Sequence, residues 1–248
     1  MHATSTLLQE ENNMDHGFLI LDFITKPLYY FLEHTFHLAD GNHMYHVTYS
    51  WFYMLVLIIV SFILIKSLKM VPGRLQNFLE VVLGVLRSLL VNTMGEHGLR
   101  FFPLIATLAL FILVCNLGGI IPGLYSPTAN LNTNLSMALV VFLLTHIVGI
   151  KIHGMKYLKH FVGPVWWMAP IMVPVELIGH LARPVSLTMR LFGNIFGEDL
   201  VLVVLLVLVP FLIPMPFLVL MIFTAVLQAF VFTLLAMMYI SGAMEEAH

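Results

Sequence analysis

Polar residues recur at steps of three or four through residues 175–209, a stretch that is otherwise apolar enough to lie in lipid. On a helix this spacing puts them on one face. They are Glu176, His180, Arg183, Ser186, Arg190, Asn194 and Glu198, with Asp199 beside the last. One arginine at the centre of a bilayer costs about 2.5–3.5 kcal/mol on insertion scales, so each arginine needs an anion or water nearby. The stripe therefore predicts a functional surface inside the membrane.

The length of this stretch constrains its orientation. Roughly 35 residues at 1.5 Å each make a helix of about 52 Å, whereas the hydrocarbon core of a bilayer is about 30 Å thick. The helix stays within that core only if it tilts by about 55°, which exceeds the usual range. We therefore expect a strongly tilted helix that presents its polar face sideways to a partner.

The whole chain has the composition of an all-α polytopic membrane protein. Of its 248 residues, 60% are hydrophobic and 10% charged, whereas about a quarter are charged in soluble globular proteins. This length predicts a single transmembrane domain, residues 47–248, with about five or six membrane helices. The lone Cys115 gives no disulfide or metal framework. A net charge of −2 without a basic run argues against a nucleic-acid partner.

Apolar runs and basic loops predict the topology. The expected spans cover about residues 47–65, 101–121, 135–150, 175–209 and 217–240. The last two form a tilted hairpin broken by the prolines of residues 210–216. Residues 75–94 are amphipathic and are expected to lie at the interface or to form a short hairpin. Lysine and arginine gather in residues 66–100 and 151–159, which places both loops and the C-terminus in the cytoplasm and an interfacial N-terminal segment, residues 1–46, outside.

The arginines and the titratable groups of the stripe must play different parts. Arginine keeps its proton in proteins, so Arg183 and Arg190 act through charge alone. The groups that can take up and release protons are Glu176, His180, Glu198 and Asp199. A row of titratable groups interrupted by a fixed cation is a proton path with a barrier at the cation. A mobile carboxylate must therefore carry each proton past the arginine. This chain offers no such carrier, which indicates that a separate subunit supplies it.

Several alternatives stay open on the residues alone. A structural explanation is that Glu176 and Arg183 neutralise one another through neighbours. Gln228 is as consistent with an interhelical hydrogen bond as with a functional role. A hairpin with ionisable faces also fits a stand-alone secondary transporter for an anionic substrate. Protease, hydrolase and nucleotide-loop motifs are absent, so no enzyme activity is predicted. Two inward histidines, His146 and His180, are too few to indicate a haem, and no cofactor is expected.

Three stretches resemble a known family. Residues 184–200, PVSLTMRLFGNIFGEDL, resemble the signature of subunit a of the rotary F-type ATP synthase. Residues 227–240, LQAFVFTLLAMMYI, resemble its C-terminal signature, and residues 130–139, NLNTNLSMAL, resemble a third stretch. The resemblance covers the chain from the first span onward. It implies a bacterial, non-catalytic proton-channel subunit in the cell inner membrane, with its N-terminus in the periplasm. The implied partners are the c-ring, subunit b of the peripheral stalk and the other ATP synthase subunits.

The resemblance also implies a central position for one arginine. Arg190 would face the proton-carrying carboxylate of the rotating c-ring, with Asn194 and Gln228 at motif positions close to it. Folding the hairpin about the middle of residues 210–216 would put Gln228 nearer Glu198 than Arg190. A tighter turn at Pro210 would place Gln228 beside Arg190, as the family resemblance implies.

The remaining motif positions would line two half-channels. Glu176 and Ser186 match positions on the cytoplasmic side. Either Glu198 or Asp199 would serve the outer half-channel, and Asp199 fits the ungapped spacing. Many bacterial relatives carry a histidine where this sequence has Ala225, so the outer path would need another group here.

Overall fold

The computed structural model describes residues 45–67, 73–154, 169–208 and 214–245, and the long elements in these ranges are all helices. They are α3 (Tyr45–Ser67), α4 (Arg74–Met94), α5 (Phe102–Gly119), α6 (Leu131–His153), α8 (Ala169–Leu208) and α9 (Pro214–Glu245). The short 3-10 helices η2 (Glu96–Phe101) and η3 (Pro127–Ala129) precede α5 and α6. Six of the described helices are long and apolar enough to cross a membrane. This confirms the expected all-α polytopic membrane protein.

Local chemistry explains several helix ends. The side chain of Asn130 accepts a hydrogen bond from the backbone nitrogen of Asn132 at 2.9 Å and caps the start of α6. Helix α4 ends at Gly95, whose φ of 67° is a left-handed conformation that favours glycine. Helix α9 begins at Pro214, because a proline at the first position of a helix loses no backbone hydrogen bond.

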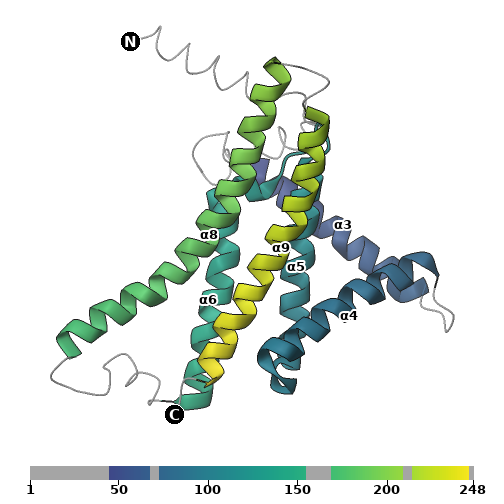
Figure 1. The fold of residues 1–248 in the computed structure, drawn as a ribbon. Coiled ribbons are helices and arrows are strands. Elements are labelled where there is room, and N and C mark those ends of the chain that lie inside the picture. The colour runs from purple at the N-terminus through teal and green to yellow at the C-terminus, as the bar shows by residue number, and fades with distance from the viewer. Residues whose placement is uncertain (1–44, 68–72, 155–168, 209–213, 246–248) are drawn as a thin grey trace, which may run out of the picture.

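Helix α9 lies against the rest of the bundle, next to α5 and α6 (Figure 1). The core that joins these helices contains Leu90 of α4, Ile112 of α5, Val141 of α6, Leu191 of α8 and Met237 of α9. Helix α8 lies beside α9 near their connection and diverges from it toward its own N-terminus, so that its first turns project from the bundle (Figure 1). The two C-terminal helices therefore form a hairpin that opens at one end.

Helix α3 meets the bundle at its N-terminal end. Tyr49 and Tyr53 are buried there, at 0% and 3% exposure. The hydroxyl of Tyr53 donates to the carbonyl oxygen of Tyr125 at 3.3 Å, in the loop between α5 and α6. Helix α5 admits this ring because residue 118 is glycine, and a Cβ there would overlap Tyr53. Beyond this contact α3 leads away from the bundle (Figure 1).

The structure corrects several expectations, among them the bounds of α6, which covers Leu131–His153 and not residues 135–150. Residues 74–94 form one continuous helix, so the short hairpin is wrong. Helix α8 begins at Ala169 and runs through Pro174 and Pro184, because prolines are tolerated in membrane helices whose neighbours satisfy the freed backbone groups. Helix α9 begins at Pro214 and not at residue 217. The expected interfacial segment at the N-terminus lies outside the described residues, except for its last two residues, which begin α3.

Candidate functional site

The polar stripe of α8 divides into an exposed edge and a buried edge. At 3.6 residues per turn the seven residues from Glu176 to Glu198 span an arc of roughly 120°, and Asp199 lies about 100° beyond that arc. The exposed members are Ser186, Arg190 and Asn194; the half-buried ones are Glu176, Arg183, Glu198 and Asp199; and His180 is buried. One edge of the stripe therefore faces away from the bundle, while the other meets α6 and α9.

Arg190 lies on the exposed edge near the middle of α8. Leu187, Leu191 and Ile195 turn inward to the core at 2%, 1% and 5% exposure. Packing of these three side chains fixes the rotation of the helix, and this rotation leaves Arg190 outside. In the described part of the chain no carboxylate lies within ion-pair distance of its guanidinium. An anion that neutralises Arg190 must come from elsewhere.

The two carboxylates near the α8–α9 connection have different neighbours. The side chain of Thr224 on α9 lies beside that of Glu198, while its hydroxyl donates to the carbonyl oxygens of Leu220 and Met221 at 3.1 and 3.0 Å. Asp199 acts electrostatically on Tyr125, in the loop before η3. Burial, and after it the negative charge of Asp199, raises the pKa of Tyr125 above its usual range. Glu198 thus faces the partner helix of the hairpin and Asp199 faces the α5–α6 loop.

The proximity of Glu198 to Thr224 gives the register of the hairpin. This register shows whether Gln228 lies nearer Glu198 or Arg190. Because α8 and α9 run antiparallel, one turn along α9 from Thr224 to Gln228 corresponds to one turn back along α8 from Glu198 to Asn194. Gln228 is buried, at 7% exposure. It therefore lies at the level of Asn194, about one turn from Arg190 and one turn from Glu198.

A buried polar network lies in the loop between α5 and α6, where the asparagines of the sequence suggested only an outer vestibule or helix caps. The hydroxyl of Thr128 donates to Oδ1 of Asn116 at 2.6 Å. Nδ2 of Asn134 donates to the carbonyl oxygen of Thr128 at 2.7 Å. Nδ2 of Asn116 and Oδ1 of Asn134 have no hydrogen-bond partner among the described residues. The loop beside Asp199 thus offers one buried donor and one buried acceptor to water. Asparagines in the α5 and α6 segments were the only signal in the sequence.

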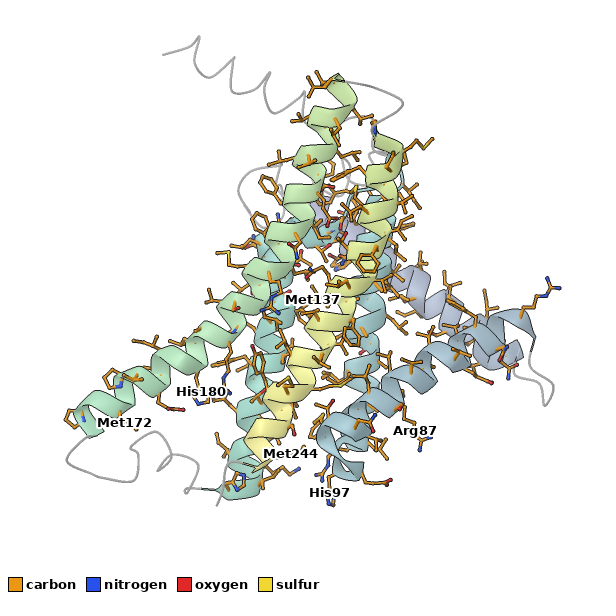
Figure 2. The ribbon with its side chains drawn as sticks, in the orientation of Figure 1. Arg87, His97, Met137, Met172, His180 and Met244 are labelled. Carbon is orange, nitrogen blue, oxygen red and sulfur yellow. The ribbon has the colours of Figure 1, made fainter. Side chains whose placement is uncertain are left out.

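The N-terminal half of α8 carries a second cluster. Nε2 of His180 lies 3.4 Å from Oε1 of Glu176. The ring of His180 also meets that of His146 on α6 edge-on, with the centroids 5.3 Å apart, and Figure 2 shows His180 between the two helices. The guanidinium of Arg183 lies 5.5 Å from the ring centroid of Tyr239 on α9. Glu176 and Arg183 therefore face different partners and do not pair directly with one another.

The two titratable ends of α8 are too far from Arg190 for direct contact. Along the helix, Glu198 is about 12 Å from Arg190 and Glu176 about 21 Å from it. Protons cannot hop such distances between side chains, so the arrangement can conduct only with water or a mobile acidic group of another chain. Within the described ranges no group of three or more His, Cys, Asp or Glu side chains is placed to hold a metal ion.

Comparison with known proteins identifies the family of this chain. The family model described as ATP synthase A chain matches residues 47–241. ATP synthase subunit a of Trichlorobacter lovleyi is 53% identical over 235 residues, which cover 95% of this chain and 100% of the relative. ATP synthase subunit a of Geobacter sulfurreducens is 52% identical over 235 residues, with the same coverage. The chain therefore belongs to the ATP synthase subunit a family.

Proposed function

We propose that this chain is the proton-channel subunit in the stator of a rotary ATP synthase, and that Arg190 faces the ring of c subunits. The observation that carries the proposal is the position of Arg190, which is exposed at the middle of an apolar helix and has no ion pair in the described chain. An uncompensated arginine in lipid costs several kcal/mol. A carboxylate on a neighbouring polypeptide would remove that cost.

Two half-channels would reach this carboxylate from opposite sides. The outer one would be lined by Glu198, Asp199 and the polar loop around Asn116, and the inner one by Glu176, His180 and Ser186. A ring carboxylate would be protonated at the outer half-channel, pass through lipid for most of a turn and release its proton at the inner one. Asn194 and Gln228, at one level of the hairpin, would separate the outer carboxylates from Arg190.

Arg190 would drive proton release and prevent leakage. At about 4 Å and an effective dielectric constant of about 20, its attraction for an ionised carboxylate is about 4 kcal/mol. This favours the ionised over the protonated carboxyl by about three orders of magnitude. The same positive charge would repel protons and keep the half-channels separate.

The proposal includes a location and partners. The chain would lie in a bacterial inner membrane, with its N-terminus in the periplasm and its C-terminus in the cytoplasm. It would contact the c-ring and subunit b of the peripheral stalk and would itself carry no catalytic site for ATP. Its part in ATP synthesis would be to couple proton flow to rotation of the ring.

The test is proton-driven ATP synthesis by the assembled complex in liposomes. Arg190→Ala should abolish synthesis, whereas Arg87→Ala, which removes an exposed arginine from α4 (Figure 2), should retain it. Near-normal synthesis by Arg190→Ala would refute the assignment. Transport of an anionic solute by the purified chain alone would instead support the secondary transporter.

A further inference from the structure

Three titratable side chains form a row across the packing of α6 and α8. Glu176 is half-buried at one end, His180 is buried in the middle and His146 is half-buried at the other end. The two links of the row are the 3.4 Å approach of Glu176 to His180 and the edge-on contact of His180 with His146. The row connects the face of α8 that carries the polar stripe with a different helix.

The neighbours of each histidine determine which ring nitrogen carries the hydrogen. Nδ1 of His146 lies 2.8 Å from the carbonyl oxygen of Phe142. A carbonyl oxygen only accepts, so Nδ1 of His146 donates and its Nε2 takes up a proton. Nε2 of His180 lies 3.4 Å from the carboxylate of Glu176, which leaves Nδ1 as the second exchange site, and Nδ1 makes no direct hydrogen bond to His146. An imidazole of this kind receives a proton on one nitrogen and releases another from the opposite nitrogen.

We propose that His146 is a proton-transfer residue of the inner half-channel, which receives protons from Glu176 through His180. This inference rests on the proposed function and adds a residue that lies outside the α8 stripe. Between Glu176 and His180 an O–H bond breaks and an N–H bond forms. Between His180 and His146 the proton passes through a water in the small cavity that both rings line: the water gains the proton of His180 and gives another of its protons to Nε2 of His146. The chemistry of the row requires titratable rings at both histidine positions.

The charged groups around the row should keep a proton from binding tightly to the histidine pair. Arg183 of α8 and Tyr239 of α9 line the same small cavity as His146 and His180. The cation–π contact of Arg183 with Tyr239 holds the guanidinium toward α9. Its permanent positive charge opposes a second cation on the histidine pair, whereas the Glu176 carboxylate favours one. A proton on the pair therefore has one attracting and one repelling neighbour and is not held tightly.

The experiment uses the assembled complex in liposomes and measures ATP-driven proton pumping as the pH on the side of the α6 C-terminus is varied from about 5.5 to 8.5, a range that brackets the titration of histidine. His146→Phe should lower the rate about tenfold or more and flatten its pH dependence. His153→Phe is the matched control, because His153 lies on the same helix and contacts the carbonyl oxygen of Ala243 at 3.2 Å, outside the row. It should keep the wild-type pH profile.

A chemical rescue separates proton transfer from packing. With His146→Ala, added imidazole should restore pumping, whereas pyrazole, which has the same shape but does not protonate near neutral pH, should not. Equal restoration by both compounds, or a wild-type rate and pH profile in His146→Phe, would overturn the role of His146. Arg190→Ala in the same preparation tests the proposed function separately: loss of pumping there together with normal His146→Phe would refute only the relay.

Discussion

The close contact of α3 with α5 allows a sharp test of the packing. In Gly118→Ala the three atoms nearest the new Cβ all belong to the ring of Tyr53. That ring is 3% exposed, packs on Phe52 with centroids 5.4 Å apart, and is tied by its hydroxyl to the carbonyl oxygen of Tyr125. It cannot swing away freely, so α3 must shift.

The size of the effect follows from two opposing contributions. Overpacking of a well-packed site costs about 1–3 kcal/mol, and the overlap here is with a fixed ring, which favours the upper part of this range. Replacing glycine by alanine within a helix gains up to about 1 kcal/mol. We therefore expect Gly118→Ala to lower the stability of the folded subunit by about 2 kcal/mol. Gly84→Ala on α4 has nothing within 4 Å of its Cβ, so it should be stabilised by about 0.5–1 kcal/mol.

The assay is the temperature at which the purified complex in detergent releases the subunit, compared for the two alanine variants and the wild type. Gly118→Ala should fall below the wild type and Gly84→Ala should rise above it. Tyr53→Phe in the Gly118→Ala background should recover part of the loss, because the hydroxyl oxygen is among the overlapping atoms. Equal release temperatures for the two alanine variants would refute the close approach of α3 to α5.

Three further changes test the polar groups of the α5–α6 loop and of the hairpin. Thr128→Val removes the hydroxyl that donates to the buried amide oxygen of Asn116, so it should lower stability by about 1–3 kcal/mol. The control is Thr107→Val, whose exposed hydroxyl bonds only within its own helix. It should change stability by less than about 0.5 kcal/mol in the same release assay. Because burial raises the pKa of Tyr125, the phenol's contribution is complete below about pH 10 and is lost as the pH rises through the raised pKa. Tyr125→Phe should therefore flatten the decline of the release temperature at alkaline pH, and an unchanged decline would contradict this. Thr224→Val removes the hydroxyl beside Glu198 and should lower proton-driven ATP synthesis severalfold, whereas Thr224→Ser should retain it.

Much of the fold was predictable because lipid imposes a strong pattern on sequence. Long apolar runs located the helices, and the three- and four-residue spacing placed Arg190 on the same side of a helix as Asn194. The ends of α8 were less predictable, because Pro174 lies inside the helix although proline ends helices in water. The level of Gln228 depended on the length of the turn, which no periodicity encodes. The network at Asn116 arises from residues that the loop brings together from separate helices.

The sequence could not predict which residues of the stripe are exposed. Their exposure separates the buried groups that could transfer protons from the exposed Arg190, which would face a partner. Residues that share a face by periodicity differ in what covers them, since the edge that carries His180 packs on α6 while the edge that carries Arg190 is exposed in the described chain. A change on the buried edge disturbs packing as well as proton transfer, so its loss of function always needs a packing control such as the imidazole rescue. A change at Arg190 removes an exposed side chain that has no ion pair within the described residues, so Arg190→Ala should leave the release temperature of the subunit close to that of wild type. Its functional loss can then be read as chemistry at the boundary between two polypeptides.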